Sequence, residues 1–80
     1  MLNDVTVYTI DNCAFCTAAK SLLGSKNIEF KEVHVDRNDV DSVLELQKKS
    51  GMRTFPQIFS GEDLIGGFTD LRALADKNGF

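Results

Sequence analysis

The sequence has no tryptophan, one proline, one histidine and only two cysteines among its 80 residues. It also has no basic cluster, and its net charge is −3, so nothing in its charge favours nucleic-acid binding. No apolar run is long enough to span a membrane. The first four residues, Met-Leu-Asn-Asp, lack the basic and apolar regions of a signal peptide. We therefore expect a cytoplasmic protein without a nucleic-acid or membrane partner.

What is present is the composition of an ordinary globular protein, with 42% hydrophobic and 26% charged residues. A chain of this length forms one domain at most, and we assign residues 1–80 to a single domain. Such a short domain buries only roughly 60% of the surface that its unfolded chain exposes. The expected core is therefore thin.

Both cysteines lie in one block, Cys13-Ala14-Phe15-Cys16, between a strand pattern and a helix pattern. In a reducing compartment such a pair is more often catalytic or metal-binding than structural. A helix N-terminus favours the thiolate, so Cys13 is the predicted nucleophile, and Cys16, one turn inside the helix, is the predicted resolving thiol. A pair that only packs is the structural alternative. A closed zinc site needs four ligands, and the chain has no second cysteine pair, so we expect no bound metal.

The periodicity predicts strands at residues 4–9 and 29–35, a hairpin of residues 57–60 and 64–66 around Gly61, and three intervening or terminal helices. The order is strand, helix, strand, helix, strand, strand, helix. The first strand–helix–strand unit predicts a parallel pair, and the hairpin must be antiparallel. We therefore expect an α/β fold with a mixed four-stranded sheet and helices on its faces. Cys13 would lie at the carboxyl end of the first strand, where such sheets place their chemistry.

The predicted helix boundaries rest on capping residues. The predicted N-caps are Asn12, Asn38 or Asp39, and Thr69, and the predicted stops are Asn27, Gly51 and Gly79. Each helix also has a predicted apolar face. These faces comprise Cys16, Ala19 and Leu23 in the first helix, Val40, Val43, Leu44 and Gln47 in the second, and Leu71, Leu74 and Ala75 in the third.

Two further segments carry candidate site residues. Pro56 either starts a strand or forms a cis peptide that leaves the Phe55 backbone free to pair with an extended thiol substrate. Gly66-Gly67 is either a tight turn or the start of an anion site at a helix N-terminus. In the second interpretation the amides of residues 68–70 bind a carboxylate and Asp70 binds an amino group. Asp70 as a simple helix N-terminal charge is the alternative.

Three motifs together resemble the glutaredoxins, small dithiol members of the thioredoxin superfamily. The motifs are Tyr8-Thr9 before the cysteine pair, Ser50-Gly51 with Arg53-Thr54-Phe55-Pro56-Gln57-Ile58-Phe59, and Ile65-Gly66-Gly67-Phe68-Thr69-Asp70. The resemblance implies a thioredoxin-like fold, a cis Pro56 and glutathione as co-substrate. It also implies a glutathione groove lined by Cys13, Phe15, Thr54, Phe55, Pro56, Gly67, Phe68, Thr69 and Asp70.

The chain departs from the common family pattern at the site. Ala14-Phe15 replaces the frequent Pro-Tyr between the cysteines, which should loosen the first helical turn. Ile10 and Val43 occupy positions where members often carry a lysine and a polar residue that hold the glycine carboxylate of glutathione. We expect Val43 in the core, weaker glutathione binding, and Arg53 or Lys49 as the substitute cation.

Two other polar side chains are candidates for minor roles. His34 is predicted to be an exposed residue of the second strand rather than a ligand or base. Lys20 is either a solvated charge or a weak contributor to thiolate stabilisation.

The expected function is glutathione-dependent reduction of protein disulfides and of glutathione mixed disulfides by a monomer. One alternative is a hydrogen donor recharged by thioredoxin reductase, for example for ribonucleotide reductase. The other is a dimer that holds a [2Fe–2S] cluster through Cys13 and glutathione, an option that the missing proline at position 14 keeps open. The segment Gly66-Gly67-Phe68-Thr69-Asp70 argues against the reductase-fed donor, because such a donor would not need residues for a glutathione site.

Overall fold

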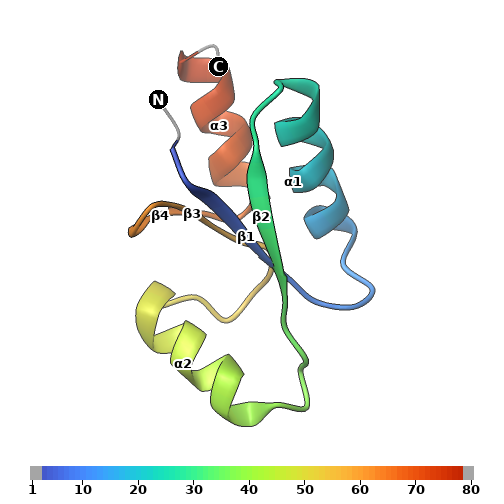
Figure 1. Cartoon of the computed structure of the whole chain (residues 1–80), viewed down its shortest axis with the longest axis vertical. Coiled ribbons are helices and arrows are strands. Elements are labelled where there is room, and N and C mark those ends of the chain that lie inside the picture. Colours follow the sequence, from blue (N-terminus) through green and yellow to red (C-terminus); the bar gives the residue numbers. More distant parts are fainter. Residues whose placement is uncertain (1–2, 79–80) are drawn as a thin grey trace.

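A computed structural model describes residues 3–78 and contains a four-stranded sheet and three helices (Figure 1). Along the chain the elements are β1 (Val5–Thr9), α1 (Ala14–Ser25), β2 (Phe30–His34), α2 (Val40–Ser50), β3 (Gln57–Ser60), β4 (Asp63–Gly66) and α3 (Phe68–Asn78). The predicted element order is confirmed. None of the helices within residues 3–78 is both long and apolar enough to cross a membrane.

The strands are arranged in the order β2-β1-β3-β4. β1 and β2 run parallel, with Val5 opposite Phe30, whereas β3 runs antiparallel to both β1 and β4. The mixed sheet predicted from the sequence is therefore present. Its two central strands, β1 and β3, carry fully buried side chains, including Val7, Ile58 and Phe59.

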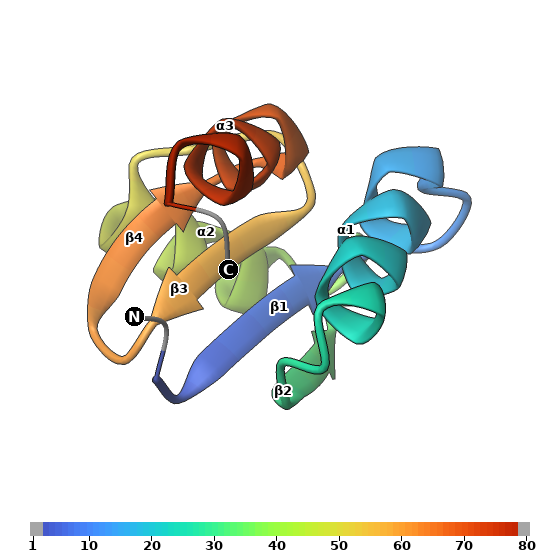
Figure 2. The ribbon, with the colours of Figure 1, turned by 90° about the horizontal axis from the view of Figure 1, so that it is seen from above.

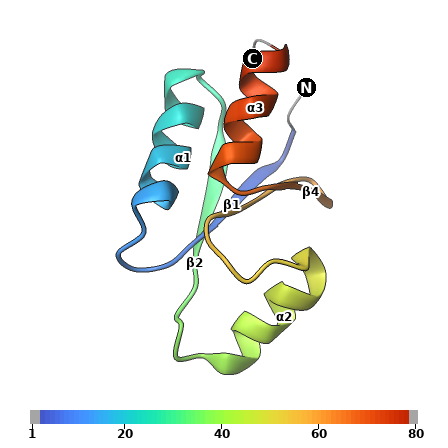
Figure 3. The ribbon, with the colours of Figure 1, turned by 180° about the vertical axis from the view of Figure 1, so that it is seen from behind.

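The helices cover both faces of the sheet. α1 and α3 lie side by side on one face and α2 lies on the other (Figures 2 and 3). One apolar cluster joins the sheet to α1 and α3 through Val5, Val7, Ala19, Leu23, Ile58 and Leu71. A smaller cluster of Val35, Leu46 and Phe59 lies on the α2 side. The core is split by the sheet into two thin layers, as expected for a chain of this size.

Two of the predicted helix starts are wrong. Asn12 does not cap α1, because its φ of 55° turns the chain into the left-handed region, and the N-cap is Cys13 with extended backbone. Thr69 lies inside the first turn of α3, which begins at Phe68. Asp70 reaches back to the residue before the helix, and its carboxylate accepts a hydrogen bond of 3.0 Å from the Gly67 N–H.

The other boundaries agree with the prediction where the structure describes them. Asp39 caps α2 by accepting hydrogen bonds from the Ser42 N–H and hydroxyl, and Gly51 ends the helix with a φ of 73°. Asn27 adopts the left-handed conformation expected after α1. Gly79, the predicted stop of the last helix, lies outside the described residues.

The predicted apolar face of α2 is only partly correct. Val40 and Leu44 are 60% and 49% exposed, and the buried residue of the helix is Leu46. The helix turns a stripe through Val43, Leu46 and Gln47 toward the sheet, so the assumed stripe was rotated relative to the real one. Val43 is half-buried and packs against the smaller core cluster. The predicted faces of α1 and α3 are correct, although Leu74 is only half-buried.

Candidate active site

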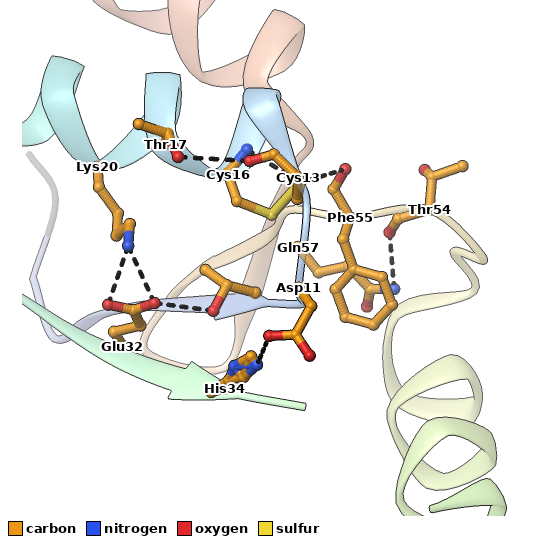
Figure 4. The surroundings of a disulfide bond; sticks show 11 residues. Asp11, Cys13, Cys16, Thr17, Lys20, Glu32, His34, Thr54, Phe55 and Gln57 are labelled. Carbon is orange, nitrogen blue, oxygen red and sulfur yellow. Dashed lines mark hydrogen bonds and ion pairs between the residues drawn. A yellow bond between two sulfur atoms is a disulfide. The ribbon is translucent and has the colours of Figure 1, made fainter. Parts of the chain in front are cut away.

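Cys13 and Cys16 are joined by a disulfide at the N-terminus of α1, just after the carboxyl end of β1 (Figure 4). Their Cα atoms are 5.2 Å apart. Cys13 is half-buried, whereas Cys16 is only 3% exposed. An incoming sulfur can therefore reach Cys13 but not Cys16, which matches the predicted roles of attacking and resolving thiol.

The backbone of α1 supplies a donor to the accessible sulfur. The Cys16 N–H donates to Cys13 Sγ at 3.1 Å, so Cys13 itself acts as the N-cap of the helix. In the reduced protein the same donor and the positive end of the helix dipole favour the Cys13 thiolate over the thiol. The capping role and the predicted nucleophilic role thus use the same atom.

The Phe55–Pro56 peptide is cis, as the resemblance implied. Pro56 is buried, and the carbonyl oxygen of Phe55 lies 3.7 Å from Cys13 Sγ. Within residues 3–78 no hydrogen bond uses the Phe55 N–H. The backbone before the proline is therefore positioned beside the disulfide with a donor available for a bound chain.

A buried amide holds the segment that leads to this proline. Gln57 is 1% exposed, and its Nε2 donates to the carbonyl oxygens of Met52 and Thr54 at 3.2 and 3.0 Å. Its Oε1 is buried without a hydrogen-bond partner among the described residues. Gln57 was predicted as a strand residue within the second motif, and nothing in its sequence pattern marks this contact. The amide fixes the loop that carries Arg53, Thr54 and Phe55 past the disulfide.

A cavity of about 510 Å³ opens beside Cys13. Three of the predicted groove residues, Phe15, Thr54 and Phe55, line it together with Cys13. Arg53, one of the two predicted substitute cations, lines it as well. Ile10 and Val43, which stand where family members often carry a lysine and a polar residue, also line the cavity, so Val43 is both a core residue and part of the cavity wall.

The other predicted groove residues lie next to this cavity rather than in its wall. Phe68 stacks on the exposed ring of Phe15, with ring centroids 6.0 Å apart. Gly67 approaches the Pro56 carbonyl, since a Cβ built on it would lie 3.7 Å from that oxygen. Thr69 and Asp70 are exposed in the first turn of α3.

Of the two predicted substitute cations, only Arg53 lies at the cavity. Lys49 lies over the ring of Phe59, 4.9 Å from its centroid, and lines a different groove between β2 and α2. Lys49 is therefore excluded from the cavity beside Cys13. A second arginine, Arg37 in the β2–α2 loop, lines that cavity instead. Sequence reasoning missed it because it belongs to none of the three motifs.

On the other side of the disulfide, polar side chains from β1, α1 and β2 form a second pocket of about 490 Å³ (Figure 4). Glu32 accepts a hydrogen bond of 2.8 Å from the buried Thr9 hydroxyl and binds Lys20 at 3.1 Å. The hydrogen bond from the Thr9 hydroxyl, and to a smaller extent that from the Lys20 ammonium, holds the pKa of Glu32 below its usual value. Lys20 is therefore a paired charge. His34 is exposed as predicted, and its Nε2 lies 2.9 Å from a carboxylate oxygen of Asp11.

Within residues 3–78, no three histidine, cysteine, aspartate or glutamate side chains come together as a metal site. The sheet order, the dithiol at a helix N-terminus and the adjoining cis-proline define a thioredoxin-like redox domain.

Comparison with known proteins identifies the family within this class of redox domains. The glutaredoxin family model matches residues 5–65. A glutaredoxin of Neisseria meningitidis serogroup A is 42% identical over 79 residues, which cover 98% of this chain and 92% of the relative. Glutaredoxin 3 of Escherichia coli K12 is 42% identical over 76 residues, or 95% and 90% of the two chains. The chain therefore belongs to the glutaredoxin family and is a thiol–disulfide oxidoreductase.

Solved structures agree with this assignment. The glutaredoxin of Brucella melitensis superposes with a TM-score of 0.79 at 42% identity, over 95% of this chain and 82% of the other. Glutaredoxin 1 of Francisella tularensis, in a complex with cacodylate, gives 0.78 at 35% identity, over 92% and 93%.

Proposed function

We propose that this protein uses glutathione to reduce glutathione mixed disulfides and protein disulfides, with Cys13 as nucleophile and Cys16 as resolving thiol. The observation that carries the proposal is the unequal exposure of the two sulfurs at the N-terminus of α1, with the Cys16 N–H directed at Cys13. The cavity beside Cys13 supplies the space for a tripeptide thiol, and Phe15, Thr54 and Phe55 are the residues that would contact it. Family membership supports glutathione as the co-substrate.

For a glutathionylated protein, the Cys13 thiolate attacks the glutathionyl sulfur. A new S–S bond forms between Cys13 and glutathione, the old S–S bond breaks, and the protein thiolate leaves and takes up a proton. A second glutathione, as thiolate, then attacks the glutathionyl sulfur on Cys13. Glutathione disulfide leaves and the Cys13 thiolate is restored, so this route does not need Cys16.

For a protein disulfide, Cys13 attacks one sulfur and releases the other as a thiolate. Cys16 then loses its proton and attacks Cys13 Sγ, which frees the second protein thiol and closes the Cys13–Cys16 disulfide. Two glutathione molecules reopen that disulfide and leave as glutathione disulfide. This route requires both cysteines.

We further propose that the protein is a monomer. We place it in the cytoplasm, because a glutathione-reduced dithiol functions where the glutathione pool is reducing.

In the part of the chain that the structure describes, Gly67, Phe68, Thr69 and Asp70 lie together beside Pro56 and Phe15. We assign this turn to the same glutathione. Asp70 already accepts the Gly67 N–H, and its second oxygen would take the amino group.

The test is the glutathione-coupled reduction of a glutathionylated peptide by the wild type, Cys13→Ser and Cys16→Ser. Activity that is lost with Cys13 and retained without Cys16 is the expected result. Reduction of a protein disulfide should need both cysteines. Activity in Cys13→Ser would contradict the assignment of the nucleophile.

An inactive wild type would reject the glutathione proposal and leave the two alternatives to separate tests. NADPH oxidation with thioredoxin reductase and no glutathione would support the reductase-fed donor. Colour after anaerobic reconstitution with iron, sulfide and glutathione, together with a dimer in gel filtration, would support the [2Fe–2S] protein.

A further inference from the structure

All the charged side chains that line the cavity beside Cys13 are positive. Of its lining residues only Arg37 and Arg53 are charged, and none is acidic. The chain as a whole carries a net charge of −3, so the charge of this cavity is opposite in sign to that of the whole chain. A cavity of this kind favours a ligand that brings negative charge to the disulfide.

Arg37 reaches this cavity from the loop between β2 and α2, on the α2 side of the molecule. It is exposed, and the ion pairs within residues 3–78 involve Lys20, His34 and Arg72 but not Arg37. Two acidic neighbours in the chain bind other groups. Asp36 accepts a hydrogen bond from the Asn38 N–H at 2.9 Å, and Asp39 accepts from Ser42. Within residues 3–78 the Arg37 guanidinium therefore has no carboxylate partner.

The remaining wall on this side of the cavity is apolar. Ile10 and Val43 both line it, and neither side chain can bind a carboxylate. A planar guanidinium can bind a carboxylate through two parallel hydrogen bonds, which a lysine ammonium cannot do. Arg37 is thus a charged donor on an otherwise apolar part of the wall.

We infer that Arg37 is a specificity-determining residue that binds a carboxylate of the thiol substrate on the α2 side of the cavity. This inference rests on the proposed function, in which the substrate is glutathione, and the carboxylate is then that of its C-terminal glycine. Arg37 thereby replaces the contacts that Ile10 and Val43 cannot make. Arg53 lies in the same wall and adds a second cation, so the loss of either arginine should weaken binding without abolishing it.

The experiment compares two substrates that differ only in this charge. The first is a glutathionylated peptide, and the second is the same peptide carrying glutathione whose glycine carboxylate is an ethyl ester. The second-order rate constant for deglutathionylation is measured with reduced Cys16→Ser protein, in which only the Cys13 step is possible, and with Arg37→Ala and Arg37→Lys in that background. Arg72→Ala is the matched control, because Arg72 lies on α3 in an ion pair with Asp76 and is not part of the cavity wall.

Arg37→Ala should lower the rate constant for the free carboxylate about 3- to 10-fold, as expected for an exposed charge pair with hydrogen bonds, and leave the ester almost unchanged. Arg37→Lys should recover part of the loss, and added salt should reduce the difference between the substrates. Arg72→Ala should have no effect on either substrate.

An equal loss for both substrates, or no loss for either, would overturn the role of Arg37 while leaving the proposed function intact. Failure of the parent Cys16→Ser protein to react with the glutathionylated peptide would instead reject the proposed function and this inference with it. Equal urea midpoints of parent and Arg37→Ala would show that the variant is folded.

Discussion

At the scale of single residues, Thr9 and Glu32 form a contact that ties β1 to the edge strand β2 below the disulfide. Thr9 is 3% exposed and donates its hydroxyl hydrogen to the Glu32 carboxylate, which also binds Lys20 from α1. A buried hydroxyl needs a partner, and the ionised carboxylate provides it. Three elements that position Cys16 are thus connected by one charged group.

This contact predicts a pH-dependent contribution to stability. The pKa of Glu32 is lower in the folded than in the unfolded chain, so near its ordinary value of 4.5 the unfolded chain binds more protons. The stabilisation is complete above that pH and is lost as the pH falls through the lowered folded value. Urea denaturation from pH 7 to pH 3 should show a steeper acid loss for the wild type than for Glu32→Gln.

Glu62→Gln, on the exposed turn between β3 and β4, is the matched control and should follow the wild type. If Glu32→Gln and the wild type lose stability in parallel as the pH falls, the contact with Thr9 does not contribute in solution.

Individual site residues differ in how well the sequence identifies them. Cys13 and Pro56 were predictable because each is rare in this chain and belongs to a spaced motif. Gln57 and Arg37 were not. Gln57 acts through backbone carbonyls that come near only after folding, and Arg37 lies in the loop between β2 and α2, outside the three motifs. A motif reports local chemistry, whereas these two roles depend on tertiary placement.

At the scale of elements, the junction of β4 and α3 depends on Gly66. Its φ is +124°, a conformation that residues with a side chain rarely adopt. A Cβ at this position would also lie 2.7 Å from Cγ and 2.9 Å from Cβ of Asp70, the residue that caps α3. The glycine is therefore needed for both the turn and the cap.

We expect Gly66→Ala to destabilise the protein by about 1–3 kcal/mol, because backbone strain adds to the displacement of the Asp70 carboxylate. Gly24→Ala is the matched substitution in α1. No atom lies within 4 Å of a Cβ built on Gly24, so alanine should stabilise the helix by about 0.5–1 kcal/mol. Urea denaturation of both variants measures the difference. Equal effects of the same sign would contradict the assigned role of Gly66.

The elements themselves were easier to predict than their ends and faces. Period-2 and period-3.6 patterns located every strand and helix, because those patterns follow from the burial that the core requires. The start of α1 was misplaced because a cysteine served as the cap in place of the usual Asn. The face of α2 was misjudged because Val40 and Leu44 are apolar but exposed, and the sequence does not show how much of a helix the sheet covers.

At the scale of the whole molecule, the two faces of the sheet are unequally supported. α1 and α3 contact each other and the sheet, whereas α2 makes few contacts with any other element and buries only Leu46. α2 nevertheless carries Val43, which forms part of the cavity beside Cys13. The substrate side of the site is therefore built on the least well packed helix.

Because local stability follows the density of buried contacts, α2 should open at a lower free energy than β1 or α1. Hydrogen-exchange mass spectrometry of the Cys16→Ser protein should show faster exchange over residues 43–50 than over residues 16–23. If the proposed function is correct, forming the mixed disulfide of Cys13 with glutathione should slow exchange in α2, which would gain contacts through Val43 and the neighbouring Arg37. Exchange in α3 after Leu71 should stay almost unchanged, because glutathione would contact only the first turn of that helix. Equal protection of α1 and α2 before glutathionylation would show that the packing difference does not control local opening. Slower exchange throughout the chain would indicate a general stabilisation in place of closure at the cavity.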